Sequence, residues 1–170
     1  MTTMNMRGSI IHRAERVFFK ALLAGYAGDG SGVKKEKPPD GYRTMTWPPT
    51  GDHGGFKVVD RFCVTPTSNR SAGTTTIFFE DQPIWWMSYG GYYDDSAIPF
   101  LKTALADAYG RQEFRGGRGP IRFQNGNFVY VNRQGFDGTS FACFEGREEI
   151  FEASSERLLG FHKYFGMLLI

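Results

Sequence analysis

The sequence has few of the features that usually reveal a compartment or a charged partner. It has two cysteines in 170 residues and a formal net charge of +2. Two cysteines are too few for a disulfide framework, and so small a charge points neither to nucleic acid nor to a membrane surface. No apolar run is long enough to span a bilayer, and residues 1–13 lack the apolar stretch of a signal peptide. We therefore expect a cytoplasmic protein without a membrane partner.

Residues that catalyse reactions or bind metals are equally sparse. His12, His53 and His162 are scattered, with no spacing that suits a metal ion. The chain contains neither a Gly-x-Ser-x-Gly nucleophile turn nor a glycine-rich phosphate loop. Cys63 and Cys143 stand among apolar residues, which is typical of buried free thiols rather than nucleophiles. We predict no catalytic residue, no metal and no cofactor, although residues that converge only in space would escape a motif search.

Aromatic residues, by contrast, are abundant. Phe, Trp and Tyr make up 16% of the chain, which also has 22 glycines and 8 prolines. This composition favours strands and turns, and the length suits a single domain, residues 1–170. We predict an α+β fold with helices at residues 9–26, capped by Ser9, and at about 97–109, capped within Asp94-Asp95-Ser96. Strands are expected at residues 42–47, 56–64, 74–79, 84–89, 121–124, 128–133, 140–144, 148–151 and 158–164.

Two loops rich in glycine and charge interrupt this pattern. Residues 27–40 include Lys34-Lys35-Glu36-Lys37 and are expected to be flexible and solvated. Residues 111–122 contain four arginines among glycines. Such a loop can follow nucleic-acid phosphates, but a single occurrence is a weak signal. We expect a second solvated loop and no nucleic-acid partner.

Four matched segments recur in the same order in the two halves of the chain. They pair residues 18–24 with 100–106, residues 56–61 with 128–133, Gly73 and residues 77–78 with Gly146 and residues 150–151, and residues 89–91 with 164–166. One helix and a small sheet bury too little surface alone, so two such units need to pack together. We predict an internal duplication, with repeats at about residues 9–93 and 96–170 related by a pseudo-two-fold axis. Such an axis leaves a groove between the repeats, where ligands commonly bind.

Several of these segments resemble a bacterial family described only as domain of unknown function 5680. The resemblance covers about residues 18–170 and rests on residues 18–28, residues 73–86 with Pro83-Ile84-Trp85, residues 87–91, the Phe-Leu-Lys helix at residue 100, Arg118-Gly119-Pro120 and residues 146–151. It implies no established chemistry for any residue of this chain. Some members follow a helix-turn-helix in regulators, but residues 1–13 are too few to hold one. A looser, fold-level resemblance is to the duplicated effector-binding domains of drug-responsive regulators.

The candidate binding residues are aromatic side chains and arginines on predicted strands. Trp85 and Trp86 are neighbours in a strand and point to opposite faces, so one of them belongs to the core. Arg61 and Arg133 occupy matching positions in the two halves, so they either converge on an anion or form surface salt bridges. The predicted site consists of Trp47, Arg61, Trp85, Trp86, Tyr89, Tyr92, Tyr130 and Arg133. The alternative is that these aromatic side chains only fill the core.

These observations favour a non-catalytic module that binds a small molecule or a peptide in an aromatic and arginine-lined groove between the repeats. The alternative is a protein-interaction inhibitor, such as an antitoxin, an immunity protein or a counter-defence protein. An enzyme of unknown type is less favoured, and a buried carboxylate or histidine facing a deep pocket would support it. The sequence leaves open a homodimer and identifies neither the ligand nor the partner.

Overall fold

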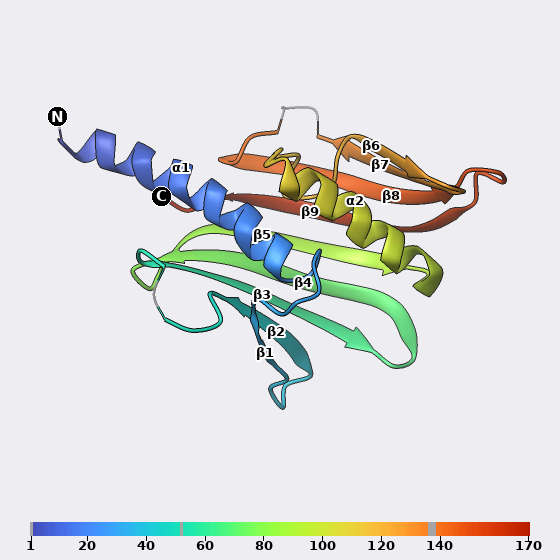
Figure 1. Ribbon diagram of the computed structural model, residues 1–170, viewed down its shortest axis with the longest axis horizontal. Coiled ribbons are helices and arrows are strands. Elements are labelled where there is room, and N and C mark those ends of the chain that lie inside the picture. Colours follow the sequence, from blue (N-terminus) through green and yellow to red (C-terminus); the bar gives the residue numbers. More distant parts are fainter. Residues whose placement is uncertain (1, 52, 136–138) are drawn as a thin grey trace.

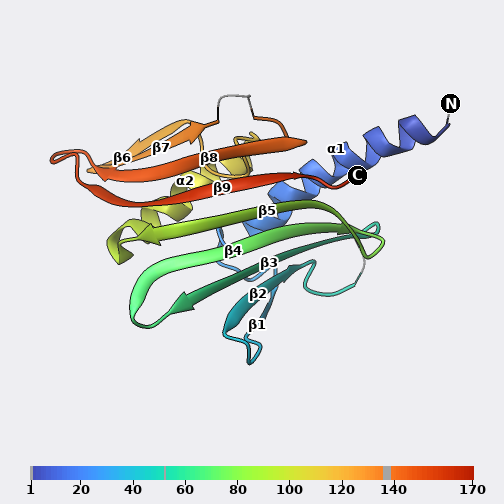
Figure 2. The ribbon, with the colours of Figure 1, turned by 180° about the vertical axis from the view of Figure 1, so that it is seen from behind.

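The computed structural model describes residues 2–51, 53–135 and 139–170 and has the predicted α+β architecture. One antiparallel sheet of nine strands carries two helices on the same face (Figure 1). No helix covers the opposite face of the sheet within the described chain (Figure 2). Of the described residues, no helical segment combines the length and the apolar character needed to cross a membrane.

The order of the strands places the two ends of the sheet far apart. The elements are α1 (Thr2–Ala24), β1 (Lys34–Glu36), β2 (Tyr42–Trp47), β3 (Phe56–Thr65), β4 (Ser68–Phe79), β5 (Gln82–Tyr93), the 3-10 turn η1 (Asp95–Ala97), α2 (Ile98–Gly110), β6 (Arg122–Asn125), β7 (Phe128–Gln134), β8 (Cys143–Glu152) and β9 (Leu158–Leu168). The strands follow the order β1-β2-β3-β4-β5-β9-β8-β7-β6. Outward from the central β5–β9 pair, β4, β3 and β2 lie on one side, and β8, β7 and β6 lie on the other.

The core lies between the sheet and the helices. Phe56 and Val58 are buried and alternate with less buried neighbours along β3, as expected for a strand with one covered face. Phe18 of α1 and Leu101 of α2 are fully buried in the same core. The Phe18 ring meets that of Trp85 at a centroid distance of 5.2 Å. Burial of each of these side chains contributes about 1.5–3 kcal/mol to folding.

Several predicted elements are confirmed. The predicted strand at residues 42–47 is β2, and α2 lies within one residue of its predicted bounds. The hairpin between β4 and β5 turns at Glu80 and Asp81, which have φ angles of 48° and 62°. One of the paired tryptophans belongs to the core, as predicted, because Trp85 is fully buried.

The predicted caps of both helices are wrong, and so is the predicted start of the first helix. The first helix begins at Thr2 rather than at residue 9, so Ser9 lies inside α1 and does not cap it. No proline interrupts residues 2–9, so nothing in this segment ends the helix early. The second helix has Ala97 at its N-cap and no side-chain cap, because η1 occupies the residues predicted to cap it.

One segment forms a strand that the sequence did not predict, and two predicted strands are in fact one. Lys34–Glu36, expected in a flexible loop, forms β1 and pairs with β2. An edge strand needs only one neighbour and tolerates lysine, which explains why a charged segment can adopt this structure. The two strands expected at residues 140–144 and 148–151 are one strand, β8, since Gly146 within it pairs with both β7 and β9.

The prediction of two buried thiols is also wrong. Both cysteines are free, but Cys63 is half-buried and Cys143 is exposed. Each cysteine is an odd number of residues from a buried residue of its own strand, five from Val58 in β3 and one from Phe144 in β8, so each lies on the opposite face. Apolar neighbours in the sequence therefore did not place the thiols in the core, because strand alternation decides the face.

Candidate functional site

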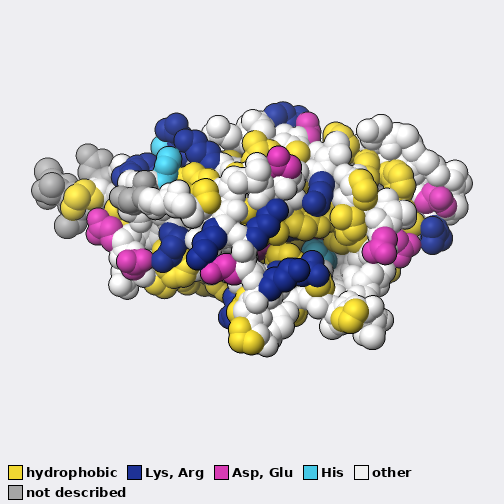
Figure 3. Space-filling model, turned by 60° about the horizontal axis from the view of Figure 1, so that its bottom comes forward, with side chains coloured by type: hydrophobic (Ala, Val, Ile, Leu, Met, Phe, Trp, Pro, Cys, Tyr) yellow, Lys and Arg dark blue, Asp and Glu magenta, His cyan; other side chains and the backbone are white. Residues whose placement is uncertain are grey.

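A cavity of about 470 Å³ lies between the helices and the inner face of the sheet. Its walls come from the end of α1, from α2 and from strands β2 to β5 and β9, so both halves of the chain contribute. Figure 3 shows the hollow with Lys and Arg side chains around it and a histidine at its bottom. The histidine among the lining residues is His162. This volume lies within the range of small-molecule sites.

Asp60 is a buried carboxylate in the wall of this cavity. It follows Phe56 and Val58 on the inner face of β3 and is only 9% exposed. Its Oδ1 accepts hydrogen bonds from the Tyr89 hydroxyl (2.8 Å) and the Thr75 hydroxyl (2.9 Å). Among the described residues, Oδ2 has no hydrogen-bond partner, so it is the acceptor that a bound molecule would meet. Burial raises the pKa of Asp60, although both hydroxyls and Arg118 oppose this shift.

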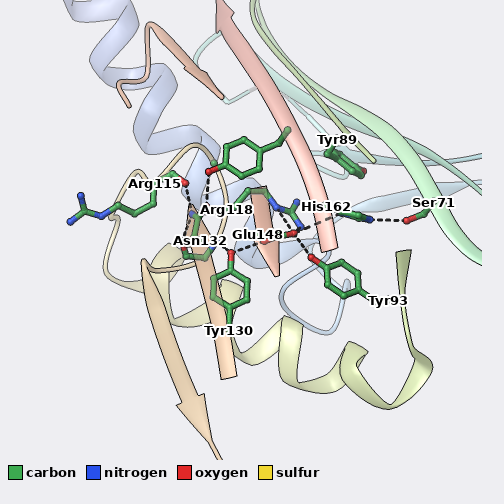
Figure 4. Close-up of polar contacts among 12 residues, drawn as sticks. Ser71, Tyr89, Tyr93, Arg115, Arg118, Tyr130, Asn132, Glu148 and His162 are labelled. Carbon is green, nitrogen blue, oxygen red and sulfur yellow. Dashed lines mark hydrogen bonds and ion pairs between the residues drawn. The ribbon is translucent and has the colours of Figure 1, made fainter. Parts of the chain in front are cut away.

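Beside Asp60, a buried ion pair joins Arg118 to Glu148 (Figure 4). Arg118 Nε donates to Glu148 Oε1 at 2.9 Å, and Nη2 donates to the same oxygen. Tyr93 donates to Oε1 at 2.8 Å and Tyr130 donates to Oε2 at 2.6 Å. Burial favours the neutral form of Glu148, but the charge and hydrogen bonds of Arg118, together with His162 and Tyr130, outweigh it and lower the pKa of this carboxyl. The ion pair is therefore charged. Both carboxylate oxygens of Glu148 accept hydrogen bonds, whereas only Oδ1 of Asp60 does so among the described residues.

His162 forms a third polar group of the cavity. Its Nε2 lies 3.0 Å from the Ser71 hydroxyl, and its Nδ1 is buried without a hydrogen-bond partner among the described residues. Nδ1 is 3.8 Å from Glu148 Oε1, so the carboxylate favours the tautomer with the proton on Nδ1. Ser71 then donates its hydroxyl hydrogen to Nε2. Burial and the Arg118 charge lower the pKa of His162 to about 4, so the ring is neutral at pH 7.

The mouth of the cavity carries cations without acidic partners. Arg43, Arg70 and Lys102 line it, and none of them forms a salt bridge with a described residue. Lys102 Nζ instead lies 5.1 Å from the centroid of the Tyr26 ring, which also lines the cavity. The exposed acids Asp29 and Asp95 line the same cavity, so its outer part carries both signs of charge, with cations in excess.

Part of the loop predicted to be solvated is in fact buried: residues 116–120 are all buried, whereas residues 111, 112, 115, 121 and 122 are exposed. Asn132 Nδ2 donates to the carbonyl oxygens of Arg115 and Gly119, at 2.9 Å each. Gly119 N–H donates to the Tyr130 hydroxyl at 2.9 Å. Glycine permits this close approach, because a Cβ at Gly119 would lie 2.7 Å from the Tyr130 ring.

The structure does not bring the predicted binding residues together. Of these eight, Tyr89 alone is among the residues that line the large cavity. Trp85 is fully buried and donates its indole N–H to the Phe141 carbonyl at 2.9 Å. Tyr130 is buried against Glu148 and takes no part in the cavity wall. Trp47 packs against His53, with 4.6 Å between the ring centroids.

The remaining predicted residues lie on the face of the sheet that no helix covers. Trp86 packs against Phe165 there, and Tyr92 packs against Phe161. Arg61 pairs with Asp40, and Arg133 pairs with Glu149, so both arginines form surface salt bridges. Four strands separate β3 from β7, which is a distance of about 24 Å. The two arginines therefore do not converge on one anion.

The predicted site omits three residues that line the cavity, Asp60, Arg118 and His162, and also Glu148, the partner of Arg118. Asp60 and Glu148 each follow the apolar alternation of an inner strand face, which is the signal that could have identified them. His162 lies in the same alternation on β9, between Gly160 and Tyr164. No pattern in the sequence indicates that Arg118 is buried. No group of three or more potential metal ligands occurs among the described residues.

The fold and the cavity together define a class: a single-sheet α+β protein with two helices over one face and a polar cavity between them. The chain belongs to the family described as domain of unknown function (DUF5680), whose model matches residues 67–167. The matched segment contains Tyr89, Arg118, Glu148 and His162, whereas Asp60 precedes it. Neither the curated proteins nor the solved structures contain a match to the chain.

Proposed function

We propose that this protein binds a small molecule in the cavity beside Asp60. The observation that carries this proposal is a carboxylate that is 9% exposed and still has one oxygen without a protein partner among the described residues. A buried charge without a partner is costly, so an interior of this kind is expected where a ligand supplies the missing contacts. The aromatic walls and the volume of about 470 Å³ suit such a ligand.

We also propose that the two halves of the chain are copies of one unit. Tyr89 donates to Asp60, and at the matching positions Tyr164 donates to Asn132 at 2.6 Å. Gly73 lies opposite Tyr89 in the β4–β5 pair, and Gly146 lies opposite Tyr164 in the β8–β9 pair. A Cβ at either glycine would meet the hydroxyl of the facing tyrosine. Shared contacts of this detail support the duplication beyond the matched sequence segments.

The comparison between the halves supports ligand binding in a second way. In the second half, residues 116–120 are buried over Asn132 and fill the space above it. In the first half, the space above Asp60 is open and forms the cavity. A ligand in the first half would therefore occupy the place that the chain itself occupies in the second.

A panel of nucleotides, aromatic amines and aromatic acids would test the proposal by thermal shift and isothermal titration calorimetry. The variant Ser71→Trp places a large ring in the cavity wall, and Ser88→Trp on the uncovered face of β5 is its matched control. We expect ligands that raise the melting temperature of the control and of the native protein but not of Ser71→Trp. Ligands that act equally on both variants, or no ligand at all, would argue against the proposal.

A hydrolytic activity is a second candidate function, because the Ser71 hydroxyl lies 3.0 Å from His162 Nε2. In this scheme Ser71 Oγ attacks an ester carbonyl carbon and its proton passes to Nε2. The proton then moves to the leaving alcohol, and water releases the acyl group from the serine. Incubation with 4-nitrophenyl acetate should acetylate Ser71, detectable by peptide mass spectrometry. Ser88→Ala should keep the reaction and Ser71→Ala should lose it. Equal rates in the two variants would exclude it.

The protein-interaction alternative stays a prediction. Co-purification with one defined partner, unaffected by Ser71→Trp, would favour it over a ligand in the cavity.

A further inference from the structure

The two halves of the protein carry complementary groups at matching positions. Asn132 presents an amide nitrogen, and its two N–H groups donate to two carbonyl oxygens of the chain's own loop. Asp60, at the matching position, presents a carboxylate oxygen that no described residue contacts. In the second half, the loop supplies hydrogen-bond acceptors for the amide nitrogen of Asn132. By analogy, a molecule bound in the first half would supply hydrogen-bond donors for the carboxylate oxygen of Asp60.

The hydrogen-bonding capacity of Asp60 defines what is missing. A carboxylate has about four lone-pair positions, and the hydroxyls of Tyr89 and Thr75 take up the two on Oδ1. Two positions remain on Oδ2, matching the two N–H groups of Asn132. Two N–H donors are therefore the complement of Asp60, just as two carbonyls are the complement of Asn132.

The outer part of the cavity adds a second requirement. Arg43, Arg70 and Lys102 at the mouth have no acidic partner among the described residues. Tyr26 and Tyr89 line the same cavity as Asp60 and these cations. A planar ring fits between such walls, and an anionic group fits the cations outside it.

We infer that the ligand is a planar molecule with two adjacent N–H donors at its inner end and an anionic group at its outer end. This inference rests on the proposed function, since it names the ligand class for the same cavity. The two donors come either from a neutral lactam with an amino group, as in guanine, or from an amidinium cation. Both can direct two N–H groups at one carboxylate oxygen, as Arg118 Nε and Nη2 do at Glu148 Oε1, and the experiment separates them.

Two matched pairs of compounds test the inference by isothermal titration calorimetry at pH 7. Guanosine 5′-monophosphate is compared with inosine 5′-monophosphate, which lacks one amino group, and 4-carbamimidoylbenzoate is compared with 4-carbamoylbenzoate, which has oxygen in place of one nitrogen. In at least one pair, the compound with paired donors should bind about 10- to 100-fold more tightly, as expected for a hydrogen bond to a charged group. The pair that discriminates identifies the head group.

Variants locate the two ends of the ligand. Asp60→Asn replaces the free oxygen with a donor and should remove the preference for paired donors, whereas Asp81→Asn, at the exposed β4–β5 turn, should not. The double variant Arg43→Gln/Arg70→Gln should weaken both members of a pair by a similar factor, about 10-fold. Circular dichroism of each variant shows whether it is folded.

The outcomes distinguish this inference from the proposed function. Equal binding within each pair, an unchanged preference in Asp60→Asn, or no binding of any of the four compounds would overturn the inference. The proposed function would still stand if other molecules of the wider panel bind and Ser71→Trp abolishes their binding. If no molecule of that panel binds, the proposed function fails as well.

Discussion

The Asp60→Asn substitution should stabilise the protein, although Asp60 is buried and hydrogen-bonded. Asparagine has nearly the same shape, and its Oδ1 can accept both hydrogen bonds that Tyr89 and Thr75 now donate. What the substitution removes is a charge that is only 9% exposed and that has no ion-pair partner among the described residues. Because the stabilising contacts remain and the desolvated charge disappears, we expect a higher free energy of unfolding.

The size of this effect follows from the raised pKa of Asp60. Burial raises it above the ordinary value of 3.8, so the folded state holds this proton more tightly than the unfolded state. The resulting stability is present below pH 3.8 and is lost as the pH rises through the folded-state pKa. For each factor of ten between the folded-state and unfolded-state acid constants, the wild type loses about 1.4 kcal/mol at higher pH. The advantage of Asp60→Asn should therefore grow with pH and then become constant.

Urea denaturation at pH 4, 6 and 8, followed by circular dichroism, measures this difference. Asn132→Asp is the mirror-image control, because it places a carboxylate against the carbonyls of Arg115 and Gly119. Loss of two hydrogen bonds and burial of an unpaired charge should destabilise this variant by about 3–5 kcal/mol. If Asp60→Asn were less stable than the wild type at pH 8, or if the difference did not change with pH, our description of Asp60 would be refuted.

Three further predictions concern the groups around the cavity. The pKa of His162 is lowered from 6.5 to about 4, so its contribution to stability is present above pH 6.5 and is lost as the pH falls toward 4. We expect this loss to be about 3 kcal/mol. In urea titrations it should be absent from His162→Gln but present in the control His12→Gln. Arg118→Met leaves Glu148 buried and unpaired, and should lower the free energy of unfolding by about 3–5 kcal/mol; a change below 1 kcal/mol, on the same order as a surface pair, would contradict the buried network. Gly73→Ala puts a Cβ 2.7 Å from the Tyr89 hydroxyl, so we expect a loss of about 1–3 kcal/mol and weaker ligand binding. Gly8→Ala in α1, where no atom lies within 4 Å of the new methyl group, should instead stabilise the protein by about 1 kcal/mol, as thermal unfolding would show.

Much of the fold could be predicted from local patterns in the sequence. Alternation and turn residues located β2 and the β4–β5 hairpin, and the apolar stripe with Pro99 near its start located α2. The errors lie where local signals compete or are absent. The first helix begins at Thr2, ahead of Ser9, the cap that the sequence predicted, and β1 forms because β2 offers a free edge, which no property of residues 34–36 reveals.

The cavity could be predicted only in part, because its chemistry depends on contacts between distant segments. The alternation of Phe56, Val58 and Asp60 places a carboxylate on an apolar face, so Asp60 was accessible to sequence reasoning. Arg118 was not, since a loop rich in arginine and glycine is normally solvated. Its burial requires Glu148 as a partner, and that partner is 30 residues away in the chain.

The cavity wall beside Asp60 includes a residue whose own loop is anchored elsewhere in the protein. Arg118 lines the cavity but comes from the loop between α2 and β6. Asn132 hydrogen-bonds two carbonyl oxygens of this loop, and Glu148 forms a buried ion pair with Arg118. The wall next to Asp60 is thus anchored by contacts that do not involve the ligand. Because these contacts are made before binding, little conformational entropy would be lost when a ligand enters. Under the proposed function, the buried Arg118–Glu148 pair holds the wall of the cavity, and Asp60 is the group that meets the ligand.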